Sequence, residues 1–165
     1  MSYSYVKAKK LIAENFNKDD ILSFSKIHKS MVPHLEKTLH ISLPKSFKYF
    51  IKDFGFGGPK SIMISGIRTN NKEEVLSTGI GWKIEKFRTE FDLPHHIILI
   101  SDIGDGSYYA LDLSQMNDKQ ECPVVVWPVG GYDETPELEI VAPDFGTWFL
   151  EQVEEQIRRH KRDAQ

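Results

Sequence analysis

The sequence predicts an α+β domain, with helices first, a mostly antiparallel sheet next and one closing helix. Three observations support this fold class. Apolar residues recur at helical spacing through the first third of the chain, strand-like spacing follows Pro59, and helical spacing returns from about Asp144. The chain has 165 residues, of which 40% are hydrophobic, so it has enough apolar material for one domain with a packed core.

The first two helices are predicted from spacing and from capping residues. Apolar residues from Tyr5 to Phe16 follow a helical rhythm, and the polar stretch 17–20 breaks it. Ser30 is a typical N-cap, and Pro33 falls in the first turn, where its missing N–H costs little. We therefore expect a second helix that ends near Leu39.

A third helix should follow the extended pair Leu43-Pro44, because the residue before proline avoids the α region. Its apolar face consists of residues at helical spacing, namely Phe47, Phe50, Ile51 and Phe54. The run Gly-Phe-Gly-Gly-Pro at 55–59 should end this helix, as a glycine C-cap followed by proline does.

The next segments predict a strand and a helix before the main sheet. Ser61–Ile67 has the pattern of a strand, and Lys72–Phe91 that of one helix with breaks allowed at Gly79 and Gly81.

A hairpin and two further strands should form the sheet. Ile97–Ile100 and Ser107–Leu113 flank the glycine-containing turn 102–106, as expected of a hairpin. Pro123–Trp127 and the short segment Leu138–Val141 extend this meander. A closing helix then presents apolar residues at helical spacing, namely Phe145, Trp148, Phe149, Val153 and Ile157.

Charge is strongly polarised along the chain. Residues 89–157 contain fifteen Asp and Glu and a single cation, Lys119. Residues 1–88 contain sixteen Lys and Arg against eight acids, and residues 158–165 contain four against one. If the acidic block folds onto one face, its field attracts cationic partners and repels nucleic acid. The alternative is that much of this acid is an ordinary solvated surface.

Metal sites find little support in the sequence. The turn with Asp102 and Asp105 lacks the further carboxylates that a calcium site needs. His95 and His96 are adjacent, so on a strand they would point to opposite faces and could not share a metal. We expect no metal and no other cofactor.

Catalytic, nucleotide-binding and membrane functions find equally little support. Cys122 lies beside Glu121, and no nearby cation would activate its thiol, so a structural cysteine is expected. Residues 58–61 resemble the end of a phosphate loop but run from helix to strand, the wrong direction for it. No apolar run reaches the length of a signal or membrane segment, and a single cysteine suits a reducing compartment. A cytoplasmic protein without catalytic residues is expected.

Aromatic residues beside acids mark the most plausible contact surface. Tyr108 and Tyr109 are neighbours on a strand, so one should face inward and the other outward. Residues 127–134 end a strand in a glycine-containing loop with two aromatic residues and two acids. Trp and Tyr dominate interface hot spots, which makes this loop a candidate binding surface. An ordinary turn is the alternative.

Several motifs, taken in order, resemble the SUKH superfamily, which comprises fungal cell-wall assembly regulators and many bacterial toxin-immunity proteins. The motifs are Leu43–Ile51, Gly57-Gly58, Asp105–Leu113, Cys122–Trp127 and Phe145–Leu150. The Glu-Cys-Pro-Val-Val stretch and a Gly-Tyr loop are most similar to the YobK type of bacterial immunity protein. The resemblance implies one SUKH-like domain over residues 1–165, with a helical extension at 1–27, the family core at 28–157 and a basic tail at 158–165.

The resemblance also implies a non-catalytic protein-binding module that neutralises a cognate toxin, such as a basic nuclease. Acidic residues would steer the encounter and aromatic residues would anchor it: Asp105, Asp133, Glu134 and Glu137, with Tyr108, Trp127 and Tyr132. Nucleic acid and membrane are not expected partners, and the oligomeric state is left open. Two alternatives remain: a small-ligand or enzymatic domain with a groove between helix and sheet, and a regulatory scaffold.

Overall fold

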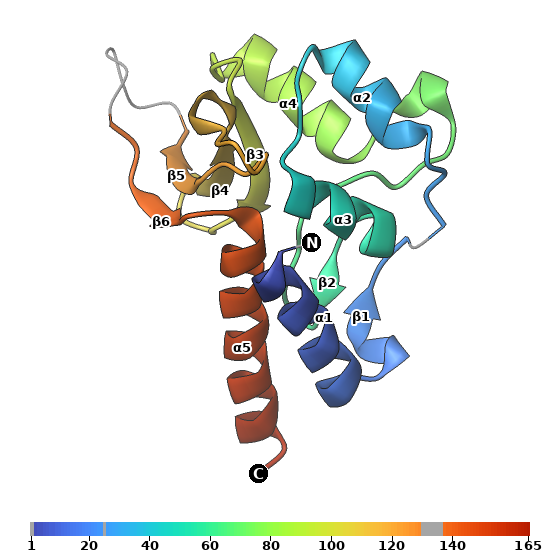
Figure 1. Ribbon diagram of the computed structural model, residues 1–165, viewed down its shortest axis with the longest axis vertical. Coiled ribbons are helices and arrows are strands. Elements are labelled where there is room, and N and C mark those ends of the chain that lie inside the picture. Colours follow the sequence, from blue (N-terminus) through green and yellow to red (C-terminus); the bar gives the residue numbers. More distant parts are fainter. Residues whose placement is uncertain (1, 25, 130–136) are drawn as a thin grey trace.

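The computed structural model describes residues 2–24, 26–129 and 137–165 (Figure 1). Its α-helices are α1 (Tyr3–Asn15), α2 (Met31–Leu39), α3 (Lys45–Phe54), α4 (Gly79–Glu90) and α5 (Phe145–Asp163). Its strands are β1 (Ile21–Leu22), β2 (Gly58–Pro59), β3 (Ile97–Asp102), β4 (Ser107–Asp112), β5 (Val124–Pro128) and β6 (Ile140–Ala142). These elements form one α+β domain, which confirms the fold class.

Short sequence signals set the helix ends. Ser30 precedes α2 as expected, although its side chain bonds the imidazole of His28 at 2.7 Å rather than an amide of the helix. Pro44 occupies the N-cap of α3 in an extended conformation, and Gly55 ends that helix at φ +75°. A Cβ on Gly55 would lie 2.2 Å from the Phe24 carbonyl oxygen, so this turn admits only glycine.

The main sheet has four antiparallel strands in the order β3-β4-β5-β6. Its two faces belong to two hydrophobic clusters, because side chains alternate along each strand. One face contributes Ile98, Leu111 and Val124 to the large cluster that α1, α3 and α5 share. The opposite face, with Leu99 and Ala110, packs against α4. Both faces of the sheet are therefore covered by helices.

Tyr108 and Tyr109 point to opposite faces, as predicted, but neither points freely outward. The Tyr109 ring centroid lies 5.2 Å from that of Trp148 on α5. The Tyr108 ring centroid lies 5.3 Å from that of Phe87 on α4. The expectation of one outward side chain is wrong because α4 covers the face on which solvent was expected.

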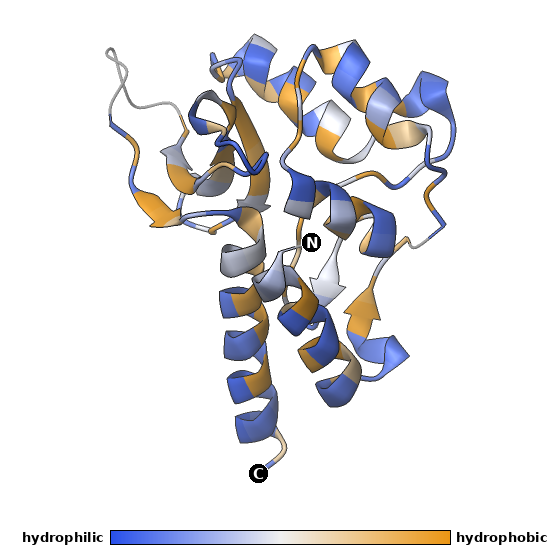
Figure 2. Ribbon diagram, viewed as in Figure 1, coloured by the Kyte–Doolittle hydropathy of each residue, from blue (hydrophilic) through white to orange (hydrophobic). Residues whose placement is uncertain are grey.

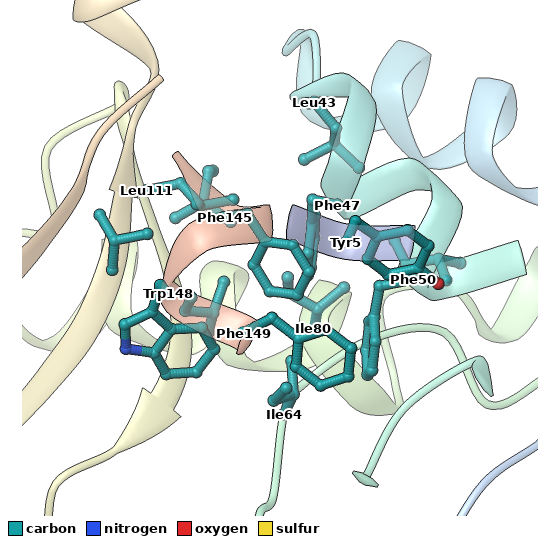
Figure 3. Packing of buried hydrophobic residues seen from close by; sticks show 14 of the residues in the cluster. Tyr5, Leu43, Phe47, Phe50, Ile64, Ile80, Leu111, Phe145, Trp148 and Phe149 are labelled. Carbon is teal, nitrogen blue, oxygen red and sulfur yellow. The ribbon is translucent and has the colours of Figure 1, made fainter. Parts of the chain in front are cut away.

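An aromatic cluster joins the first and last helices (Figure 3). Tyr5 on α1 is fully buried, and its ring stacks near Phe149 on α5, with ring centroids 5.9 Å apart. Phe50 on α3 meets Phe145 and Phe149 from the other side, at 5.6 and 5.5 Å. Figure 2 shows hydrophilic and hydrophobic residues alternating along α1 and α5, as expected for helices with one buried face.

Two predicted elements differ from the structure. Ser61–Ile67 is not a strand: Ile64 forms only an isolated bridge with Gly57, and the Ser65 N–H donates to the Ile100 carbonyl at 2.8 Å. The helix expected over Lys72–Phe91 begins only at Gly79, after a short 3-10 turn at Lys72–Glu74. His95 and His96 lie in a turn before β3 rather than on a strand.

Candidate protein-binding site

Two connections meet at one end of the main sheet. Ser107 at the start of β4 pairs with Pro128 at the end of β5. The Val129 N–H then donates to the Gly106 carbonyl at 3.0 Å, which ties the start of the β5–β6 connection to the β3–β4 turn. The antiparallel register thus brings the Asp102–Gly106 turn beside Pro128 and Val129, the last described residues of the β5 side. We call this region the loop end of the sheet, defined by residues 102–108, 127–129 and 137–139.

The aromatic pair predicted at this end is brought together by the register. Tyr108 pairs with Trp127 across β4 and β5. Trp127 is only 8% exposed and packs against Phe87, with ring centroids 6.4 Å apart. Tyr108 is half-buried, with its ring edge-on to Phe87. Trp127 therefore offers little surface to a partner.

The turn carries two exposed carboxylates that are locked in place. Asp105 accepts from the Ser107 N–H at 3.1 Å and from the Ser107 hydroxyl. These bonds, the hydroxyl bond first, hold the pKa of the Asp105 carboxyl below its usual range. Asp102 accepts from the Gly104 N–H at 2.7 Å. The turn thus carries fixed negative charge at neutral pH.

The other predicted residues lie on the β5–β6 connection. Glu137, the first described residue after 130–136, is exposed. Leu138 packs against the same hydrophobic cluster as Tyr108. Glu139 is also exposed, and its carbonyl accepts the Val126 N–H at 3.0 Å. Tyr132, Asp133 and Glu134 fall at 130–136, outside the described residues, and stay predictions.

A lysine that sequence reasoning missed lies beside Tyr108. Lys83 on α4 donates from Nζ to the Ser65 hydroxyl at 3.0 Å, and its ammonium lies 5.5 Å from the Tyr108 ring centroid. Burial lowers the pKa of Lys83, while the negative charge of Asp102 opposes that shift. Burial raises the pKa of Tyr108, and Asp102 adds to the rise. The sequence holds one signal for Lys83: the helical spacing of Ile80, Ile84 and Phe87 places this lysine at the edge of the buried face of α4.

The acidic block does not form one uniform face. Several of its acids serve their own backbone: Asp112 accepts from the Ser114 N–H at 3.0 Å, and Asp144 caps α5 by accepting from the Thr147 N–H at 2.7 Å. Glu155 forms an ion pair with Arg158 at 2.8 Å. These acids coexist with the exposed carboxylates of the loop end, so only some acids of the block lie together on the surface.

One comparison with known proteins decides the family. The SUKH_5 family model, described as SMI1-KNR4 cell-wall, matches residues 8–154. The chain belongs to the SUKH family. The matched region begins inside α1 and ends inside α5, so it contains Phe50, Phe145 and Phe149 of the aromatic cluster but not Tyr5.

Two further features of this SUKH domain concern its cysteine and its possible metal ligands. Cys122 is buried, and burial together with the charge of Glu121 raises the pKa of its thiol to about 12. Across residues 2–24, 26–129 and 137–165, no three His, Cys, Asp or Glu side chains lie together as metal ligands would. Over the same ranges, the helices are too short or too polar to cross a membrane.

Side chains pack together between α4 and one face of the sheet. Phe87 from α4 packs into the same cluster as Leu99 and Val125 from the strands. Ile97 and Ala110 in that cluster are fully buried.

Proposed function

We propose that this SUKH domain is a non-catalytic immunity protein that binds and neutralises a cognate toxin through the loop end of its sheet. The observation that carries the proposal is the bond from the Val129 N–H to the Gly106 carbonyl, at 3.0 Å. This bond holds Val129, which follows β5, against the β3–β4 turn that carries the carboxylates of Asp102 and Asp105. The resemblance of the sequence to bacterial toxin-immunity proteins supports a toxin as the partner.

Electrostatics favours a basic partner such as a nuclease. Asp102 and Asp105 are exposed on the turn, and Glu137 and Glu139 are exposed on the neighbouring connection. Charges of one sign at an interface rim accelerate encounter with an oppositely charged protein, and this acceleration weakens as salt is added. An acidic inhibitor on the substrate surface of a nuclease would also exclude the nucleic acid.

Anchoring falls to Tyr108 in this proposal. Its ring is held on one side by Phe87, so little conformational entropy is lost when a partner covers its free edge. Trp127 is the buried cross-strand neighbour of Tyr108, and both rings pack against Phe87. Tyr132, Asp133 and Glu134 remain proposed contacts from the sequence.

The first test is co-purification with the products of neighbouring genes at low and high salt. A salt-sensitive complex with a protein that carries a basic toxic domain is expected. If no protein is retained at either salt but a small molecule is, the immunity proposal is wrong and a ligand-binding role takes its place.

Residue roles are then tested by association kinetics with that protein. Asp105→Asn combined with Glu137→Gln should slow association several-fold at low salt, because asparagine can keep the turn bonds to Ser107 while two charges are lost. Glu151→Gln, which removes one exposed charge from α5, is the matched control and should change little. Equal rates for both variants would remove Asp105 and Glu137 from the interface.

A further inference from the structure

The outer surface of α4 carries an open hollow on the side away from the sheet. Its volume is about 380 Å³. The lining side chains combine apolar, cationic and acidic groups: Leu76, Trp82, Glu85, Lys86, Thr89 and Glu90. The opposite side of α4 buries Ile80, Ile84 and Phe87, so helix packing does not require the residues of the hollow.

Trp82 is the distinctive residue of this hollow. Its side chain is 45% exposed, whereas Trp127 and Trp148 are buried. The Lys86 ammonium lies 4.9 Å from the centroid of the Trp82 ring. Within the described residues, no carboxylate lies within 4.0 Å of that ammonium to hold it as an ion pair. The ring face is thus already used as a cation site by the protein's own lysine.

We propose that this hollow receives an arginine side chain from a partner protein, whose guanidinium replaces the Lys86 ammonium over Trp82. A planar guanidinium stacks on an indole face more fully than an ammonium does, and it is less strongly hydrated. Glu85 and Glu90 line the same hollow and can accept its remaining N–H donors. The hollow contains two carboxylates and one lysine, so its net charge is negative and complements the positive charge of an arginine.

Lys86 acts as an internal competitor in this arrangement. Its ammonium must leave the ring before a guanidinium can stack there, and its charge repels the incoming cation. Removal of Lys86 should therefore strengthen arginine binding, an effect opposite to that expected if Lys86 merely helped to shape the surface. This inference does not depend on the toxin assignment, because the hollow lies across α4 from Tyr108 and shares no residue with the loop end of the sheet.

The test follows the indole N–H signals in ¹⁵N-labelled protein titrated with N-acetyl-arginine amide. Trp82→Phe assigns the Trp82 signal, and the signals of Trp127 and Trp148 serve as internal controls. A saturable shift of the Trp82 signal alone is expected, whereas the neutral isostere N-acetyl-citrulline amide should give a much smaller shift. Equal shifts for the two compounds, or shifts of all three indoles, would overturn the proposal.

Two variants test the competition. Lys86→Met should tighten arginine binding by about two- to five-fold, the range expected for one exposed cation–π contact. Lys119→Met removes an exposed positive charge elsewhere and should leave the affinity unchanged. Glu85→Gln with Glu90→Gln should weaken binding. Unchanged or weaker binding by Lys86→Met would contradict the proposed site, as would full binding by the double glutamine variant.

Discussion

The hydroxyl of Tyr5 makes a polar contact between α1 and α3. It donates to the Asp53 carboxylate at 2.6 Å, and Lys9 lies 3.1 Å from the same carboxylate. Tyr5→Phe removes this hydrogen bond and keeps the fully buried ring beside Phe149. A hydrogen bond to a charged group contributes about 1.5 to 3 kcal/mol. Because Lys9 still pairs with Asp53, we expect a loss at the lower end, about 1.5 to 2 kcal/mol.

Thermal and urea unfolding measure this loss. For a chain of this size the expected change is a fall in Tm of about 3 to 8 °C. Tyr3→Phe is the matched control, because Tyr3 is 79% exposed on the same helix and should have no effect. The Asp53→Asn variant completes a double-mutant cycle, in which the losses should not add. Equal stability of Tyr5→Phe and Tyr3→Phe would refute the assigned role of the hydroxyl.

The same contact predicts a pH dependence with a definite sign. Burial, and then the hydrogen bond to Asp53, raise the pKa of Tyr5 well above its ordinary value of 10.0. The contribution of this group to stability is therefore complete below pH 10 and declines as the pH rises above it. Wild-type protein should lose stability between about pH 10 and 11 more steeply than Tyr5→Phe in parallel urea titrations.

Further predictions concern the packing of Gly81, the pH dependence of stability that Glu121 causes, and the reactivity of Cys122. Gly81→Ala gains helix propensity, but its Cβ would lie 1.9 Å from the Val75 carbonyl oxygen, so urea unfolding should show a net loss of about 1 to 3 kcal/mol. Burial raises the pKa of Glu121 despite its bonds from Ser46, so this carboxyl contributes stability that is complete below pH 4.5 and declines as the pH rises. Glu121→Gln should therefore raise Tm relative to wild type more at pH 7 than at pH 4, and an identical difference at both would contradict this. The Cys122 thiol should react with iodoacetamide at pH 8 at least about a hundred-fold faster in urea-unfolded than in native protein; comparable rates would place it at the surface.

The sequence predicted the order of the elements well where one periodicity dominated. The three helices before Gly55, the hairpin and the closing helix follow apolar spacing that the core later uses. Ser61–Ile67 shows why the same method failed elsewhere. Ile62 and Ile64 are buried while Met63 is 53% exposed, which gives a strand-like period, yet the backbone bonds Gly57 on one side and Ile100 on the other without forming a ladder.

The candidate site was predicted in part. Chain order and turn residues indicated that Asp105 and Tyr108 lie near the end of a hairpin. The burial of Trp127 could not be read from the sequence, because it depends on Phe87 reaching it from α4, and that contact needs the tertiary fold. Helical spacing places Lys83 at the edge of the buried face of α4, but its contacts with Ser65 and Tyr108 come from separate segments and depend on the tertiary fold.

The pairing of Tyr5 with Phe149 has a consequence for synthesis. The core shared by α1, α3 and α5 cannot close until α5 has left the ribosome, because Phe145 and Phe149 complete the cluster. Until then the nascent chain presents Phe50 and its neighbours to solvent, a surface to which chaperones bind. A chain arrested before α5 would keep that surface exposed, so quality control could distinguish copies that contain α5 from copies that lack it.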